Sequence, residues 1–279
     1  MYPTDFDYHR PESVSDAVKL LKENPEAKVL AGGHSLLPVM KLRLAMPTAL
    51  IDITRLSELS GVREDGDAVV IGANTTYSEL MASDVIKQKL PFLVDAADQV
   101  GDVQVRNVGT IGGACAHCDP AADFPAIVLA LDAEIKTVGS SGEQTHKASD
   151  FFVDMFTPRL EPDEVITEIR LPNVADIASA TYQKFAHPAS GYAIVGVAGV
   201  RTSGGDVRLT VTGSVPITTR LTAAEGEISG KDLNEANIKA AADKAGEGLD
   251  FVGDIHASDQ YRAHLTRVFT RRALEKLAG

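Results

Sequence analysis

The stretch Ala31-Gly32-Gly33-His34-Ser35 follows a short apolar run that is typical of a β-strand. A second glycine pair stands in Thr110-Ile111-Gly112-Gly113-Ala114, with Gly112 placed 80 residues after Gly32. Either pair alone predicts a tight turn at the end of a strand, because glycine readily adopts a positive φ. Glycine also lets backbone N–H groups approach an anion closely. Together the two pairs predict one diphosphate-bearing ligand, held from both sides.

The composition is that of an ordinary globular chain. Its 279 residues are 44% hydrophobic and 24% charged, which is enough for two moderate domains. A formal net charge of −12 argues against nucleic acid and anionic membrane surfaces as partners. The N-terminus lacks the pattern of a signal peptide, no run approaches the roughly 20 apolar residues of a membrane span, and two cysteines make no disulfide framework. We expect a cytoplasmic protein without a membrane span.

The first part of the chain mixes predicted helices and strands. Ser13 is expected to cap a helix that runs to Glu23, and Ser35 to cap another over residues 36–44. Asp-Gly at 65–66 predicts a hairpin. Further strands are predicted at 28–31, 50–53, 68–71, 134–138 and 165–171, and further helices at 77–81, 85–99 and 123–131, the last with Asp123 as its N-cap. A domain boundary is expected near 173–178.

The second part of the chain predicts a small antiparallel sheet followed by helices. Alternating runs at 180–186, 192–201 and 207–214 predict three strands. Helices are predicted at 235–246 and 258–277. In the last helix, Tyr261, Leu265, Val268 and Phe269 are expected to form the buried stripe. Arg262 and the other basic residues of that helix are placed on a solvated face, with a docking surface as the alternative.

Common catalytic and nucleotide-binding motifs do not occur. The sequence contains no G-x-G-x-x-G after a strand, no P-loop, no G-x-S-x-G and no H-E-x-x-H. Polar residues instead crowd around the glycine pairs. Ser35 and Thr110 offer hydroxyls to phosphate, with Asn107 nearby, and Asp123 suits ribose hydroxyls. We name no catalytic residue, and the pattern favours a chain whose chemistry belongs to a bound cofactor.

The segment Cys115-Ala116-His117-Cys118 raises a metal site and a redox pair as alternatives. It offers at most three ligands within four residues, whereas structural zinc takes four. Pro120 and Pro125 interrupt the helix that would follow a thioredoxin-like C-x-x-C. We predict no metal site and expect both cysteines to pack as small hydrophobic residues.

Five segments, taken together, resemble the FAD-binding medium subunit of the molybdenum hydroxylases, the flavoprotein chain of carbon monoxide dehydrogenase and the xanthine dehydrogenase family. They are residues 31–35, 104–113, 119–123, 192–195 and the C-terminal segment 261–274. The resemblance implies an α+β chain with FAD as its cofactor. A PCMH/vanillyl-alcohol-oxidase-type FAD-binding domain would occupy residues 1–176, and a smaller domain of a three-stranded antiparallel sheet plus helices residues 177–279.

The resemblance also implies which residues hold FAD. Both glycine loops would hold the pyrophosphate, Asp123 would reach the adenosine ribose, and Val100 would lie on the adenine side. Ile166 and Lys184 would contact the flavin half. Tyr192 matches an aromatic residue near the isoalloxazine ring, with a core tyrosine in a strand as the alternative. The implied set is Val29, Leu30, Ala31, Gly32, Gly33, His34, Ser35, Leu36, Val100, Asn107, Thr110, Ile111, Gly112, Gly113, Ala114, Asp123, Ile166, Lys184 and Tyr192.

The sequence departs from the family pattern at three places. Ala114 stands where the family commonly has Asn, which removes one polar contact to the cofactor. Gly191 stands where Asp often precedes the aromatic residue, which removes a charge near the flavin. Cys115 and Cys118 occupy positions that are usually apolar or small.

The function implied is that of an electron-exit subunit. Substrate would be oxidised on a large molybdopterin-containing subunit, and electrons would cross a small iron–sulfur subunit to FAD in this chain and then to an external acceptor. The assembly would be a heterotrimer or a dimer of heterotrimers. Two alternatives stay open: a stand-alone FAD-dependent oxidoreductase, and a non-catalytic nucleotide-binding assembly module.

Overall fold

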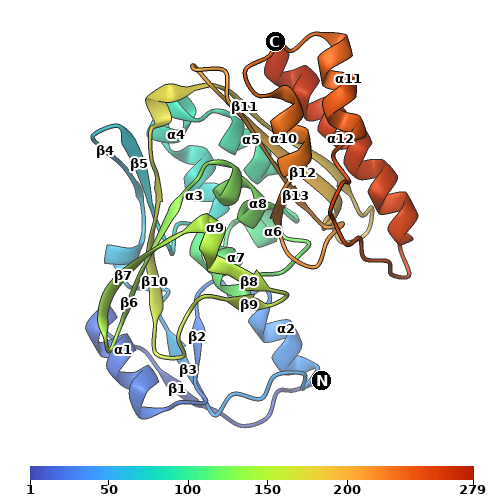
Figure 1. Ribbon diagram of the computed structural model, residues 1–279. Coiled ribbons are helices and arrows are strands. Elements are labelled where there is room, and N and C mark those ends of the chain that lie inside the picture. The colour runs from blue at the N-terminus through green and yellow to red at the C-terminus, as the bar shows by residue number, and fades with distance from the viewer.

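Three β-sheets covered by helices make up the chain, and the computed structural model describes residues 1–279. Figure 1 shows the N-terminal sheet in the lower part of the molecule, the largest sheet in the middle and the C-terminal helices at the upper right. A two-stranded ribbon, β8 (Phe152–Asp154) with β9 (Thr157–Pro158), completes the strands. None of the helices combines the length and the apolar composition that a membrane span requires.

The N-terminal sheet is parallel, with strand order β1-β3-β2. Its strands are β1 (Asp7–His9), β2 (Lys28–Leu30) and β3 (Ala49–Asp52). Helix α1 (Val14–Glu23) begins where predicted, because the Ser13 side chain accepts the Asp16 N–H. Helix α2 (Leu36–Lys41) is shorter than predicted and makes no side-chain cap bond to Ser35. The reason is that Ser35 has a helical backbone (φ −94, ψ −49), whereas a capping residue needs an extended one.

The middle sheet is antiparallel, with strand order β4-β5-β10-β6-β7. Its strands are β4 (Val62–Asp65), β5 (Ala68–Gly72), β10 (Val165–Leu171), β6 (Glu134–Gly139) and β7 (Gly142–Lys147), and a 3₁₀ turn, η1 (Ser57–Leu59), precedes β4. The hairpin predicted at Asp-Gly is confirmed as β4–β5. Sequence analysis missed β7 because nearly all its residues are polar and exposed, so no hydrophobic alternation marks it.

Short helices lie on this sheet and between it and the C-terminal sheet. They are α3 (Tyr77–Ala82), α4 (Asp84–Lys89), α5 (Phe92–Asp98), α6 (Val103–Arg106), α7 (Ile111–His117), α8 (Asp123–Ala130) and α9 (Ala148–Phe151). The single helix predicted over 85–99 is wrong: Pro91 separates α4 from α5, because proline cannot donate the backbone hydrogen bond that a continuous helix requires.

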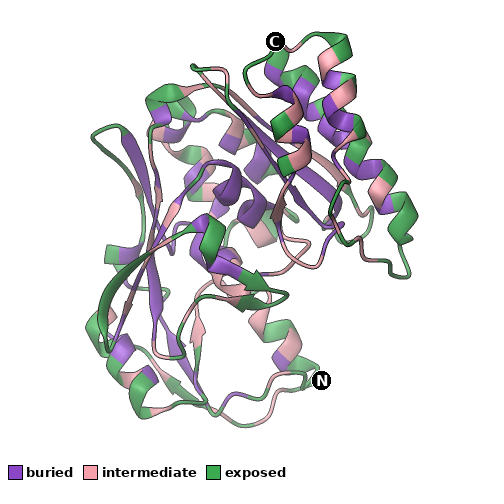
Figure 2. Ribbon diagram, in the orientation of Figure 1, coloured by how far each residue is buried: buried purple, intermediate pink, exposed green.

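Helix α8 is the centre of the molecule, and every one of its residues is buried (Figure 2). It contributes to the largest hydrophobic core, which also takes in residues of β10 and β12. Ala122 occupies the N-cap and Asp123 is the first helical residue, so the predicted cap is wrong. The Asp123 carboxylate instead binds Lys184 and Tyr182 of β11 (Ile177–Ala186).

The C-terminal sheet has four strands where three were predicted. They are β11 (Ile177–Ala186), β12 (Ala193–Thr202), β13 (Val207–Thr212) and β14 (Thr219–Arg220), with a 3₁₀ turn, η2 (Val174–Asp176), before them. Strand β14 is only two residues long, too short to show an alternating pattern. Helices α10 (Thr222–Ile228), α11 (Glu235–Asp243) and α12 (Asp259–Ala278) follow.

The faces of α12 differ in part from those predicted. Leu265 and Phe269 are buried as expected, but Tyr261 is 45% exposed. Arg262, expected on a solvated face, is buried and 5% exposed. Its guanidinium donates to the backbone carbonyls of Ile194 and Gly213 and pairs with a carboxylate of the preceding loop. A long polar side chain can be buried where carbonyl or carboxylate oxygens accept its hydrogen bonds. Helical periodicity alone does not reveal where such acceptors lie.

Candidate functional site

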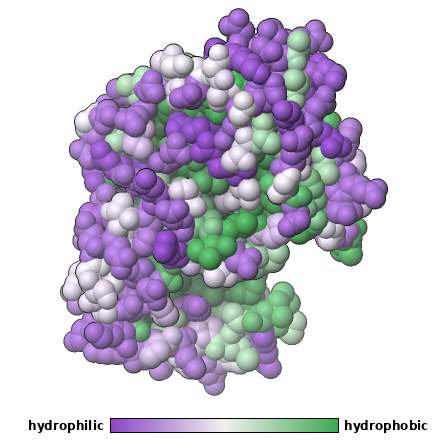
Figure 3. Space-filling model, in the orientation of Figure 1, coloured by the Kyte–Doolittle hydropathy of each residue, from purple (hydrophilic) through white to green (hydrophobic).

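A cavity of about 690 Å³ lies between the N-terminal sheet, the middle sheet with its helices, and the loop that precedes β12. Its walls come from residues 27–45, which include β2 of the N-terminal sheet, residues 100–123 around α7, residues 156–166 up to the start of β10, and residues 190–192 before β12. In Figure 3 the surface is hollowed between the lower lobe and the rest of the molecule, with apolar side chains gathered on both sides. An enclosure of this size accommodates a large cofactor.

Most of the residues predicted to hold the cofactor line this cavity. Those that do are Val29, Ala31, Gly32, Gly33, His34, Ser35, Leu36, Val100, Thr110, Gly112, Gly113, Ala114, Asp123, Ile166 and Tyr192. Those that do not are Leu30, Asn107, Ile111 and Lys184. Asn107 is engaged by the Ser78 hydroxyl, which donates to its Oδ1 at 2.7 Å, and Ile111 lies in the core.

The first glycine loop, residues 31–35, offers unpaired donors. The backbone N–H groups of Gly32, Gly33, His34 and Ser35 make no hydrogen bond within the chain. Gly33 has φ +72, and a Cβ on Gly32 would lie 2.2 Å from the carbonyl oxygen of Val108. Hence Gly33 is needed for its left-handed backbone and Gly32 for close packing. All four residues line the cavity, and a run of free N–H groups in a cavity wall suits an anion.

The second glycine pair is built differently. Gly112 and Gly113 lie in the first turn of α7, so the predicted strand-end turn is wrong. The Gly112 N–H donates to the Ala73 carbonyl at 2.9 Å, and the Gly113 N–H to the Thr110 hydroxyl at 3.1 Å. A Cβ on Gly112 would approach the Ala73 Cβ to 2.5 Å. This pair therefore provides close packing and a lining surface, while the first loop provides the free donors.

A buried ion pair stands beside the cavity. The Lys184 ammonium lies 2.9 Å from the Asp123 carboxylate and also donates to the Gln99 carbonyl at 2.9 Å. The Tyr182 hydroxyl donates to the second carboxylate oxygen of Asp123. Burial raises the pKa of Asp123, against the opposing charge of Lys184. Lys184 thus ties β11 to α8 and to the end of α5, and the side chain of Lys184 is only 1% exposed.

Aromatic side chains stand at the rim of the cavity. Tyr192 is 46% exposed and Phe156 is 52% exposed. The Phe156 ring lies 5.1 Å from the His117 ring, and Phe156 has φ +54. Burial lowers the pKa of His117 and raises that of Tyr192. Sequence analysis missed Phe156 as a lining residue, because a left-handed backbone at a phenylalanine leaves no sequence signal.

The two cysteines are free and buried. Burial raises the pKa of Cys115 to about 12 and that of Cys118 to about 11. The Cys118 thiol donates to the Asp154 carbonyl at 3.4 Å. Both thiols are therefore protonated at neutral pH and lie in the core that supports α7.

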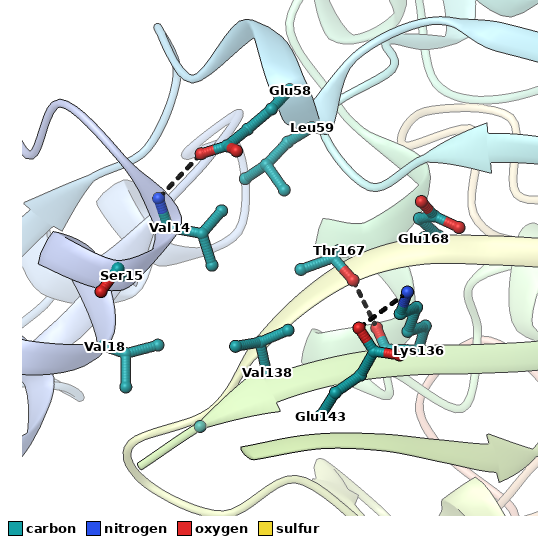
Figure 4. A pocket seen from close by; sticks show the side chains of 11 residues that line it. Val14, Ser15, Val18, Glu58, Leu59, Lys136, Val138, Glu143, Thr167 and Glu168 are labelled. Atoms are coloured by element: carbon teal, nitrogen blue, oxygen red, sulfur yellow. Dashed lines mark hydrogen bonds and ion pairs between the residues drawn. The ribbon is translucent and has the colours of Figure 1, made fainter.

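A second pocket, of about 360 Å³, lies between α1 and the middle sheet (Figure 4). Its charged groups are already paired within the chain. Glu58 accepts the Val14 N–H at 2.8 Å, Lys136 pairs with Glu143 at 2.8 Å, and Glu168 is bound by an arginine of β4 at 2.9 Å. A pocket whose polar groups are satisfied has little left to offer a ligand, so we place the functional site in the larger cavity.

Residues 4–174 match the family described as the FAD binding domain in molybdopterin dehydrogenase, and residues 180–277 match the CO dehydrogenase flavoprotein C-terminal domain. The chain belongs to this FAD-binding medium-chain family. The resemblance stated from the sequence is thereby confirmed, as is FAD as the family's cofactor.

Relatives of this medium-chain family cover the whole chain. The carbon monoxide dehydrogenase medium chain of Hydrogenophaga pseudoflava is 39% identical and is matched over 98% of this chain and 97% of its own length. The glyceraldehyde dehydrogenase medium chain of Sulfolobus acidocaldarius is 37% identical, with complete coverage of both chains. A solved structure of the Hydrogenophaga pseudoflava carbon monoxide dehydrogenase, 41% identical, superposes with a TM-score of 0.95 over 99% of this chain and 98% of that one.

The residues present fit the family's cofactor. FAD combines a diphosphate, which needs donors, with hydroxyl-bearing sugars and two flat ring systems. The first glycine loop supplies free N–H groups. Asn74, which sequence analysis missed, also lines the cavity; its Nδ2 donates to the Ile53 carbonyl at 2.6 Å, whereas its Oδ1 is buried without a partner. An orphaned acceptor of this kind suits a hydroxyl-bearing ligand.

Proposed function

We propose that this chain is the electron-exit subunit of a molybdenum hydroxylase complex, with FAD as the carrier through which electrons leave for an external acceptor. The single observation that carries the proposal is the first glycine loop, whose residues line a cofactor-sized cavity and keep their N–H groups unpaired, in a chain of this family. FAD, when bound, supplies reversible electron transfer. The protein's task is then to hold, orient and tune the carrier.

The names of the relatives support a division of labour with partner subunits. One relative is named as the medium chain of a carbon monoxide dehydrogenase and another as that of a glyceraldehyde dehydrogenase. Chains of one fold thus serve enzymes with unrelated substrates. We propose that substrate oxidation takes place on a large molybdopterin-containing subunit, and that a small iron–sulfur subunit connects it to this chain.

Roles for the cavity residues follow from position and chemistry. We propose that Gly32 to Ser35 bind the diphosphate through their N–H groups, and that Ile166 lies against the isoalloxazine with Tyr192 at the exposed rim. We assign Lys184 an indirect role. Its ammonium is held by Asp123 and Gln99, and through them it fixes the wall that the ligand meets.

A visible spectrum of the purified protein tests the cofactor, since bound flavin absorbs at about 450 nm. A chain that stays colourless after incubation with FAD, alone and with its co-purifying subunits, would contradict every flavin function. Co-purification with a large and a small subunit is expected for the electron-exit role. Turnover of an organic substrate by this chain alone would instead identify a stand-alone oxidoreductase.

A further inference from the structure

A buried carboxylate without a cationic partner lies in the cavity wall. Glu164 immediately precedes β10, lines the cavity and is 4% exposed. It forms no salt bridge with any lysine, arginine or histidine of the chain, although ion pairs join many other carboxylates. Burying an ionised carboxylate is costly unless charge or hydrogen bonds compensate, so this position calls for an explanation.

The Glu164 side chain is held in one orientation by its surroundings. The Glu161 N–H donates to Glu164 Oε2 at 3.0 Å, and the Glu164 N–H donates back to the Glu161 carbonyl at 3.0 Å. Gly139, on the neighbouring strand β6, leaves room for the stem, because a Cβ there would lie 2.6 Å from Glu164 Cγ. One carboxylate oxygen is therefore fixed by the turn.

The other carboxylate oxygen, Oε1, is left without a partner. It accepts no hydrogen bond from the chain and is not among the polar atoms sealed from solvent. Of the cavity residues nearest in sequence, Leu160, Pro162, Val165 and Ile166 are apolar, and Glu161 is the one other charged residue. An ionised carboxylate is acceptor-only, so the natural complement is an N–H donor at the edge of an otherwise apolar, flat ring.

We propose that Glu164 is a positioning residue that accepts the ring N–H (N3–H) of the isoalloxazine through Oε1. The inference rests on the proposed function, in which Ile166 lies against that ring. Glu164 and Ile166 are two residues apart, and side chains at that spacing share one face of an extended chain. A fixed negative charge at this edge disfavours the addition of electrons to the ring, so Glu164 also lowers the midpoint potential of the bound flavin.

The test uses the full chain with the subunits that co-purify, stripped of FAD, and compares the wild type with Glu164→Gln. Glutamine keeps an oxygen for the Glu161 N–H but turns an amide donor toward the ligand. We expect affinity for FAD and for FMN to fall at least about tenfold, as loss of a charge-assisted hydrogen bond predicts. Affinity for ADP should be unchanged, and the flavin midpoint potential should rise.

Asp163→Asn is the matched control. It removes the neighbouring charge, outside the cavity lining, where Asp163 accepts the Ser140 N–H at 3.2 Å. Its affinities and potential should match the wild type. Equal effects of both variants would overturn the proposal by revealing a general charge effect, as would a Glu164→Gln variant that behaves like the wild type. A loss of ADP affinity with an unchanged potential would assign the carboxylate to the adenine amino group instead.

A ligand-side measurement avoids dependence on the variant's folding. FAD methylated at N3 lacks the proposed donor, so the wild-type chain should bind it at least about tenfold more weakly than FAD, whereas Glu164→Gln should discriminate less between the two. Equal wild-type affinities would overturn the proposal. A wild-type chain that takes up no FAD at all would overturn the proposed function itself, which is a different result.

Discussion

Replacing Gly32 with alanine tests whether the two glycine segments must touch. The added Cβ would lie 2.2 Å from the Val108 carbonyl oxygen, 2.9 Å from its carbon and 3.0 Å from the Gly109 Cα. All three are backbone atoms, so no side chain can rotate away. Ordinary contact begins near 3.4 Å, which requires the loops to separate by about 1 Å, and overpacking of this kind costs about 1–3 kcal/mol.

The loop that must move is the one that carries the free N–H groups. We therefore expect Gly32→Ala to lose FAD affinity at least about tenfold, in addition to its loss of stability. Titration of the apoprotein with FAD and urea unfolding measure the two effects. Gly226→Ala is the matched control, because a Cβ there meets nothing within 4 Å and alanine favours a helix. Wild-type FAD affinity in Gly32→Ala would refute the reasoning that close contact of the loops shapes the site.

Three further predictions concern buried groups. Lys184→Met should lower the free energy of unfolding by about 3–5 kcal/mol in chemical denaturation, because Asp123 would be left buried without its cation; a loss below about 1 kcal/mol would contradict the ion pair's importance. Cys115 and Cys118 should resist iodoacetamide at about pH 8 in the folded protein and react only after unfolding, since burial raises their pKa values to about 12 and 11; rapid labelling of the native chain, followed by mass spectrometry, would disprove this. Burial raises the pKa of Asp254, but hydrogen bonds from the buried arginine of α12 and from two backbone N–H groups outweigh burial and lower that pKa to about 2. The stability that the ionised Asp254 contributes is therefore present above about pH 4 and lost as the pH falls toward 2. The difference in unfolding free energy between wild type and Asp254→Asn should shrink over that range.

Much of the fold follows from local pattern. The Ser13 cap, the hairpin at Asp-Gly and the long strands of both antiparallel sheets are signalled by capping chemistry, turn chemistry and alternation, and all appear in the structure. The misses have tertiary causes. Strand β14 is two residues long and depends on pairing with Thr210 and Val211. Arg262 is held inside by the carbonyls of Ile194 in β12 and of Gly213 just after β13, which no helical period reveals.

Some residues of the candidate site can likewise be predicted from the sequence, and others only from the fold. Gly32 and Gly33 carry a sequence signal, because glycine alone fits their backbone and packing. Glu164 and Phe156 carry no comparable signal in the sequence. Glu164 becomes distinctive only when the fold buries it beside a cavity without a cation, and Phe156 only when its backbone proves left-handed.

The two glycine pairs resemble each other in sequence, yet they solve different physical problems. Backbone donors that face a ligand must be left unpaired in the empty protein, which costs stability unless the rest of the chain holds them open. In the first loop, the N–H groups of Gly32 to Ser35 are unpaired in this way. The N–H groups of the second pair donate to the Ala73 carbonyl and the Thr110 hydroxyl. This second segment packs closely, and it supports the first loop through the contact of Gly32 with Val108. The first pair can therefore keep its N–H groups free because the second pair packs closely against its surroundings.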